Sequence, residues 1–163
     1  MKRLLAIFLC LLLISGCSQN DDHTMDERYF DMLALLESEQ NYQAPVNYAV
    51  SVELSATDDG NYRYYVIIDE PKIAMYEIQA MAIVEGDDYS QTMAANVGIF
   101  EGVSYAMIPN QTNVDAGYVG GLSISGLTDH APCRVLVMVR YRLEGDHESV
   151  IREYYSFDVD VTE

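Results

Sequence analysis

Residues 46–69 read VNYAVSVELSATDDGNYRYYVIID and hold the clearest structural pattern in the chain. From Val46 to Leu54, apolar and polar residues alternate, which is typical of a β-strand with one buried face. Asp59-Gly60 is a turn signal, and a second run rich in Tyr, Val and Ile follows it. The stretch therefore predicts an antiparallel hairpin.

Short strand candidates separated by Gly, Pro, Asn and Asp continue to the end of the chain. The alanines of AMYEIQAMAIVEG at 74–86 also suit a helix, but its mixed alternation between turn signals favours a strand. The other candidates are VGIFEG at 97–102, VSYAMIP at 103–109, VGGLSISGL at 119–127, CRVLVMVRYRL at 133–143 and VIREYYSFDVDV at 150–161. These strands predict that residues 45–163 form one all-β domain, an antiparallel β-sandwich.

Part of this domain resembles a known fold. GLSISGLTDHAPCRVLVMVRYRL at 121–143 resembles consecutive strands of fibronectin type III and related immunoglobulin-like domains, in the Gly126-Leu127 ending and in the alternating valines that follow. The chain has no tryptophan, so the core tryptophan common in those domains is missing. The resemblance implies an immunoglobulin-like sandwich of about seven strands. It implies no activity, because this fold hosts many functions.

A helix is predicted over residues 24–40, before the sandwich. Thr24 and Glu27 have the spacing of a capping box. Five apolar residues fall on one helical face, so the helix is amphipathic: Met25, Tyr29, Met32, Leu33 and Leu36. We expect this face to pack against an edge or an end of the sandwich, with binding to a partner as the alternative.

The N-terminus has the form of a secretory signal peptide. Lys2 and Arg3 precede eleven residues, Leu4 to Ile14, that are apolar throughout. A helix that crosses a membrane needs about 20 such residues. The segment is therefore predicted to direct secretion and then to be removed.

The end of this segment, Ile14-Ser15-Gly16-Cys17, resembles the lipobox of bacterial lipoproteins. The resemblance implies cleavage between Gly16 and Cys17, which removes residues 1–16, and a diacylglycerol lipid on Cys17. Two or three acyl chains hold a protein stably on a membrane, and the polar residues 17–23 would then form a tether. A plain secretory signal peptide is the alternative.

Lipidation would place the domain in the bacterial cell envelope, on the extracytoplasmic side of the cell membrane. Ser18 is not the aspartate that marks inner-membrane retention in Gram-negative lipoproteins, so an outer-membrane location is open if the host has one. Nine Lys and Arg residues face 26 Asp and Glu residues, and removing Lys2 and Arg3 leaves seven. Such an acidic chain repels nucleic acid, so we expect no nucleic-acid partner.

No pattern in the chain predicts catalysis. Asp129, His130 and Cys133 are of types that can form a nucleophilic set, but Cys133 opens an apolar strand and is interpreted as a core thiol. The acidic turns near Asp59, Asp87 and Asp146 lack calcium-loop spacing and are interpreted as solvated turns, with a calcium site as the alternative if folding brings two of them together. His23, His130 and His147 are too scattered to predict a zinc site. We therefore expect no catalytic residue, no metal and no cofactor.

Tyrosine is the most unusual component, with 13 residues. The candidate binding residues are Tyr62, Tyr64, Tyr154 and Tyr155, on the hypothesis that some of their rings face solvent and contact a partner. The alternative is that the strands are rich in tyrosine only because this residue has a high propensity for β-strands. The function predicted is a non-enzymatic binding or accessory module for an envelope protein or a glycan. The alternatives are a structural subunit of an envelope complex and an unrecognised hydrolase.

The lipobox hypothesis predicts the fate of Cys17. Replacing Cys17→Ser removes the thiol that receives the lipid, so the variant should remain an uncleaved precursor that incorporates no labelled fatty acid. Metabolic labelling of wild type and variant measures this. Absence of lipid label in the wild type, with a mature start elsewhere, would refute the hypothesis.

Overall fold

The hairpin predicted over residues 46–69 is present. Its strands are β1 (Ala49–Ala56) and β2 (Tyr62–Asp69), which pair antiparallel along their whole length. In the turn between them, Gly60 has a φ of +84°, a conformation that glycine adopts without a Cβ clash. The glycine of the Asp59-Gly60 turn signal is therefore needed for the backbone conformation of this turn.

The computed structural model describes residues 25–145 and 149–161. The predicted signal peptide, tether and lipidated cysteine lie outside the described residues, as does Thr24 of the capping box. Among the described residues, no helix is long and apolar enough to cross a membrane. The remaining elements are α2 (Met25–Ser38), β3 (Met75–Val84), β4 (Ala95–Val97), β5 (Tyr105–Met107), the 3-10 turn η2 (Val114–Ala116), β6 (Gly121–Thr128), β7 (Cys133–Arg142) and β8 (Ile151–Val159).

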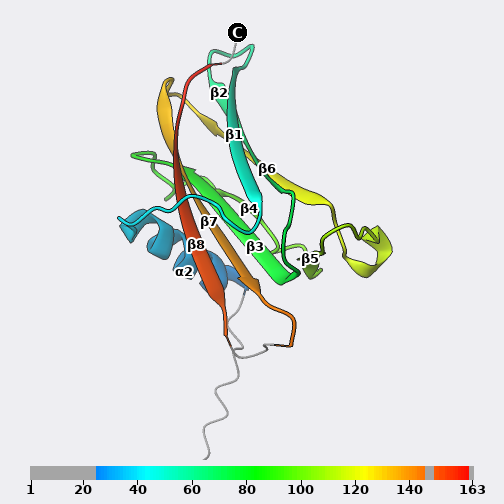
Figure 1. Ribbon diagram of the computed structural model, residues 1–163. Helices are drawn as coiled ribbons and strands as arrows, with labels where there is room; N and C mark the ends of the chain where they lie inside the picture. The colour runs from blue at the N-terminus through cyan, green and yellow to red at the C-terminus, as the bar shows by residue number, and fades with distance from the viewer. Residues whose placement is uncertain (1–24, 146–148, 162–163) are drawn as a thin grey trace, which may run out of the picture.

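The strands form two antiparallel sheets that pack together (Figure 1). One has the order β1-β2-β6, and the other has the order β4-β3-β7-β8, with β5 paired to β3. The predicted all-β sandwich is confirmed, with eight strands among the described residues, of which β4 and β5 have three residues each.

The main core lies between the two sheets, and Tyr64 is at its centre. Tyr64 is 1 % exposed, and its hydroxyl donates to the Ala82 carbonyl on the opposite sheet at 3.2 Å. Gly126 pairs with Tyr64 on the neighbouring strand, and a Cβ at Gly126 would overlap the tyrosine ring. The glycine of the Gly126-Leu127 motif therefore makes the space that the ring fills.

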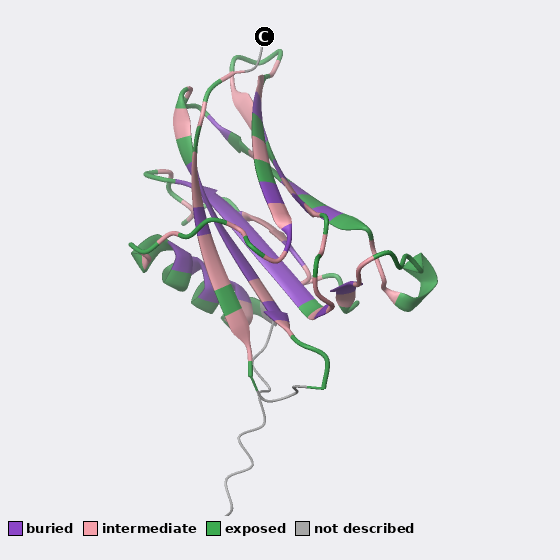
Figure 2. Cartoon of the chain, in the orientation of Figure 1, coloured by how far each residue is buried: buried purple, intermediate pink, exposed green. Residues whose placement is uncertain are grey.

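A second core lies on the outer face of the five-stranded sheet, where α2 covers β3 and β7. As a result most of β3 and the middle of β7 are buried on both faces, and β3 is nearly continuous purple in Figure 2. The helix contributes four of the predicted face residues, and the two strands contribute four more: Tyr29, Met32, Leu33 and Leu36 with Met81, Ile83, Leu136 and Met138.

The structure differs from two of the sequence-based predictions. The helix was expected at an edge or an end of the sandwich, but it packs on a sheet face, because the outer sides of β3 and β7 are apolar and need cover. The strand predicted at 97–102 is replaced by β4, which ends at Val97, and by bends that follow at Gly98. The helix itself runs from Met25 to Ser38, within the predicted 24–40.

A polar network joins the chain before β1 to β8. The Tyr48 hydroxyl donates to Glu153 Oε2 at 2.5 Å, and the Tyr155 hydroxyl donates to the Tyr48 hydroxyl at 2.7 Å. Burial raises the pKa of both tyrosines, so their hydroxyls stay protonated to a higher pH than that of an exposed tyrosine. The network satisfies the polar tips of two buried rings and connects the two sheets at one edge.

The contact between Tyr64 and Gly126 predicts a stability effect. A methyl group introduced by Gly126→Ala should force the buried ring from its place and lower the free energy of unfolding by about 1–3 kcal/mol. Ser125→Ala, on the exposed face of the same strand, should change it by no more than about 0.5 kcal/mol. Urea unfolding of the full chain measures both, and equal effects would contradict the packing described.

Candidate functional site: an arginine-lined pocket

A pocket of about 820 Å³ lies between α2 and the outer face of the five-stranded sheet. Its walls come from α2, the first part of β3, the loop between β4 and β5, the end of β7 and the start of β8. Four of the lining residues are arginines: Arg28, Arg140, Arg142 and Arg152. The pocket therefore gathers basic side chains from three separate elements.

The strand geometry explains why three of these arginines share one side of the sheet. On β7, Leu136 and Met138 belong to the core under α2, and the alternation of a strand carries Arg140 and Arg142 to the same side. Arg152 on β8 stands directly opposite Arg140 in the register of the two strands. On this face of the sheet, the apolar residues that pack under α2 are thus followed directly by the arginine side chains.

Neighbouring polar groups orient two of the guanidinium groups. Arg140 Nη1 donates to Gln79 Oε1, and Gln79 Nε2 donates in turn to the Gly98 carbonyl at 3.0 Å. Gln79 is only 7 % exposed, so this bond is held inside the protein. Arg142 Nε donates to Glu77 Oε2 at 2.8 Å. Such bonds place the side chains before a ligand arrives, which lowers the entropy cost of binding.

A bulge in β3 shapes the wall of the pocket. The pairing of β3 with β7 shifts register between Tyr76 and Gln79, and Glu77 has a φ of +50°. A non-glycine residue in this region costs about 1–3 kcal/mol, and such residues cluster at functional sites. Gly98 lies against the bulge, where a Cβ would overlap the Ile78 carbonyl. Bulges of this kind redirect side chains near binding and active sites.

The charge of the pocket is opposite to that of the chain. Its four arginines face two acidic lining residues, Asp31 and Glu77, whereas the whole chain has a net charge of −17. Like charges directly opposite each other in a sheet repel, as Arg140 and Arg152 do here. A guanidinium offers paired N–H donors that match a carboxylate or a phosphate. The arrangement suits an anionic group bound between the arginines.

The structure corrects the proposed surface strip of tyrosines. Tyr62 and Tyr64 do share a face, but that face points into the main core, where Tyr64 is buried and Tyr62 packs half-buried. Tyr155 is also buried, and Tyr154 is half-buried against the core under α2. The solvent-facing ring on β2 is Tyr65, which is 39 % exposed. The buried rings cannot form a recognition surface in this fold.

Cys133 is half-buried at the start of β7 and packs against the main core. Burial raises the pKa of its thiol, and the negative charges of Asp87 and Asp160 raise it further. The reactive thiolate is therefore disfavoured near neutral pH. This environment supports the interpretation of Cys133 as a structural residue.

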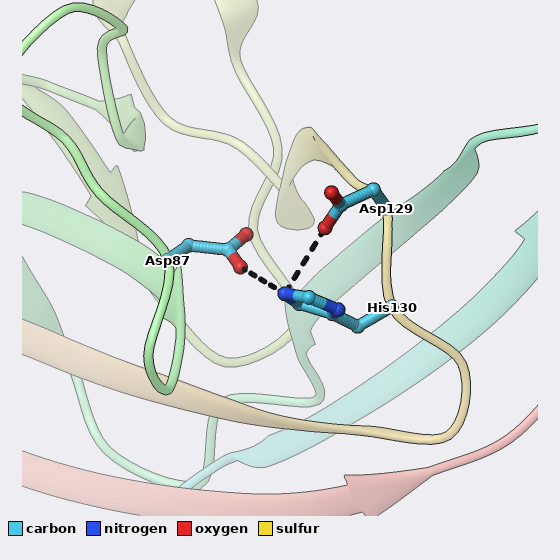
Figure 3. A group of neighbouring side chains, drawn as sticks. All are labelled: Asp87, Asp129 and His130. Atoms are coloured by element: carbon cyan, nitrogen blue, oxygen red, sulfur yellow. Dashed lines mark ion pairs between the residues drawn. The ribbon is translucent and has the colours of Figure 1, made fainter.

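A second polar group lies at the opposite end of the same strands (Figure 3). The Nε2 atom of His130 is 3.0 Å from Asp129 Oδ1 and 3.3 Å from Asp87 Oδ1. Asp87 follows β3, whereas Asp129 and His130 precede β7, so two distant segments meet. Burial raises the pKa of the Asp87 carboxyl, and a hydrogen bond with the Thr128 side chain and the nearby His130 act in the opposite direction.

Sequence reasoning missed both groups for the same reason. The pair Arg140 and Arg142 shows the spacing of one strand face, but Arg152 is placed beside them only by the pairing of β7 with β8. Asp87 and His130 were assigned to unrelated turns, although the last β3–β7 pair, Val84 with Val135, brings those turns together. Both groups depend on strand register across the sheet.

No family model matches the chain, and neither a curated protein nor a solved structure does. The two groups described above are therefore interpreted from their own chemistry.

The environment of Cys133 predicts its reactivity. Because its thiol is half-buried with a raised pKa, a disulfide reagent at pH 8 should modify it at least about tenfold more slowly in the folded chain than in denaturant. The Cys133→Ser variant measures the background from any other thiol. Equal rates in the folded and denatured chain would show that the thiol is open and reactive.

Proposed function

We propose that this protein is a lipid-anchored, non-enzymatic binding module of the bacterial envelope that takes an acidic group of a partner protein into its arginine pocket. Cys17 would carry the anchor, and residues 17–23 would tether the domain to the extracytoplasmic side of the cell membrane, or to the outer membrane where the host has one. The module's task is then recognition, as part of or accessory to an envelope complex.

One observation carries the proposal. After removal of Lys2 and Arg3, seven basic residues remain in the chain, and four of them line this one pocket. Among the residues that the structure describes, this concentration of arginines beside two acidic lining residues makes the pocket locally basic, which suits an anionic group.

The other lining residues favour a protein partner over a glycan. The apolar part of the lining consists of aliphatic side chains, among which Leu35 and Val103 are large and exposed. Among the described residues, the pocket lining includes no aromatic side chain on which a sugar could stack. Exposed aliphatic groups around a cationic centre suit an acidic side chain or a C-terminal carboxylate with its own apolar neighbours.

The anchor and the pocket are close in the chain. Arg28 follows Cys17 by eleven residues, and it lies in the second turn of α2. A lipid on Cys17 would therefore hold the pocket near a membrane surface. This supports a partner that is itself an envelope protein, and it keeps the accessory-subunit alternative within the same proposal.

Exchange of two pocket arginines tests the proposal. Arg28→Gln with Arg152→Gln removes two positive charges and should weaken binding at least about tenfold, because losing one member of a desolvated charge pair costs about 2–5 kcal/mol. Arg63→Gln with Lys72→Gln removes the same charge outside the pocket and should leave binding unchanged. Affinity is measured on the partner recovered from detergent-solubilised envelope membranes with the full chain.

Three outcomes would contradict the proposal. Equal affinity of the pocket variant and the wild type would remove the pocket from the interface. Equal weakening in both double variants would indicate only a general charge effect. Recovery of a glycan that survives protease treatment would assign the pocket to a different class of ligand.

A further inference from the structure

We infer that Asp87, Asp129 and His130 form a binding site for a divalent transition-metal ion, with Zn²⁺ as the best match. The three ligand atoms, one from each side chain, lie within 4.8 Å of one another. Figure 3 shows the two carboxylates directed at one nitrogen of the imidazole ring from two different loops. This site is separate from the arginine pocket and does not depend on it.

The spacing of the ligand atoms fits a metal ion. Zinc bonds to His nitrogen and carboxylate oxygen are about 2.0–2.2 Å long, so neighbouring ligands of a tetrahedral ion are about 3.3 Å apart. His130 Nε2 is 3.0 Å and 3.3 Å from the two carboxylate oxygens. A small closure of the two loops around an ion would reach this geometry.

The chemistry of the group also favours a cation. A neutral imidazole carries one proton, and its Nε2 atom can direct that proton to only one carboxylate at a time. The second carboxylate then faces the first at short range, in a chain that is already strongly acidic. A divalent ion would be bound by all three groups at once and would neutralise both carboxylates.

Thr128 connects the two loops that carry the ligands. It is 5 % exposed, and its Oγ1 atom accepts a hydrogen bond from the backbone N–H of His130 at 3.2 Å. The Thr128 side chain also hydrogen-bonds the Asp87 carboxyl. One buried hydroxyl therefore connects the two loops behind the ligands, in the way that outer groups orient ligands in metal sites.

The types of ligand atom in this group favour some metal ions over others. Calcium takes about 6–8 oxygen ligands, and magnesium needs near-octahedral oxygen coordination, so an imidazole and two carboxylates suit neither well. Zinc accepts nitrogen and oxygen ligands, and three protein ligands leave one position for water. For such a site the affinity should rise from Mn²⁺ through Co²⁺ to Zn²⁺.

Titration of Zn²⁺ into the metal-free full chain in detergent tests the site. Calorimetry should show one ion per chain, and His130→Ala or Asp87→Asn should weaken binding at least about tenfold, since even outer groups of metal sites contribute that much. Asp88→Asn is the matched control, because this neighbouring carboxylate accepts hydrogen bonds from Ser90. It should bind as the wild type does. His23 and His147 are present in every variant, so a difference cannot arise from them.

Thermal unfolding gives a second readout. His130 is exposed, so His130→Ala should melt close to the wild type without metal, whereas Zn²⁺ should raise the Tm of the wild type and the control only. The inference is overturned if the wild type binds no Zn²⁺, if all variants bind it equally, or if Ca²⁺ binds as tightly. The first result would leave the group as an ion pair alone.

Discussion

The pairing of β3 with β7 is the constraint on which the rest of the structure depends. The two strands lie side by side in the middle of the larger sheet, and both of their faces are buried. Their inner side chains meet the smaller sheet, and their outer side chains meet α2. Burial of apolar surface contributes about 25 cal/mol per Å², so this strand pair stabilises two separate layers at once.

The same strand pair places the polar groups at its ends. Along β7 the outer face changes from Leu136 and Met138 to Arg140 and Arg142, which line the pocket between the strand and α2. At the other end, the loops that leave β3 and enter β7 bring Asp87 beside His130. Four arginines thus gather at one end of the strand pair, with Glu77 among them, and Asp87, Asp129 and His130 meet at the other end, where Arg134 also lies. Sites supported by strands keep their geometry better than sites on long loops.

The sequence predicted the features that depend on residues close to one another in the chain. The hairpin followed from alternation and from Gly60, and the buried face of α2 followed from the spacing of Tyr29, Met32, Leu33 and Leu36. The apolar runs of β3 and β7 were predicted only to be strands, although such runs are typical of strands that are covered on both faces. Reading them as two-sided would have placed the helix correctly.

The tyrosines show a second limit of sequence reasoning. A period of two tells which residues share a face, but it does not tell which face meets the core. On β2 the face of Tyr64 also carries the buried Val66 and Ile68, and the missing side chain of Gly126 makes room for the Tyr64 ring. The long-range register that unites Arg140 with Arg152 has no local signal at all.

The two proposed sites lie at opposite ends of the domain, and the proposed anchor precedes the end that carries the arginine pocket. Helix α2 begins at Met25, and its second turn lines the arginine pocket, so the chain from Cys17 enters the domain at the end that carries the arginines. The group at Asp87 and His130 lies beyond the far ends of the same strands. With a lipid on Cys17, the cationic pocket would therefore be held toward the membrane and the anionic group away from it. A partner in the pocket and a metal ion at the far loops would then occupy opposite ends of β3 and β7, so neither would obstruct the other.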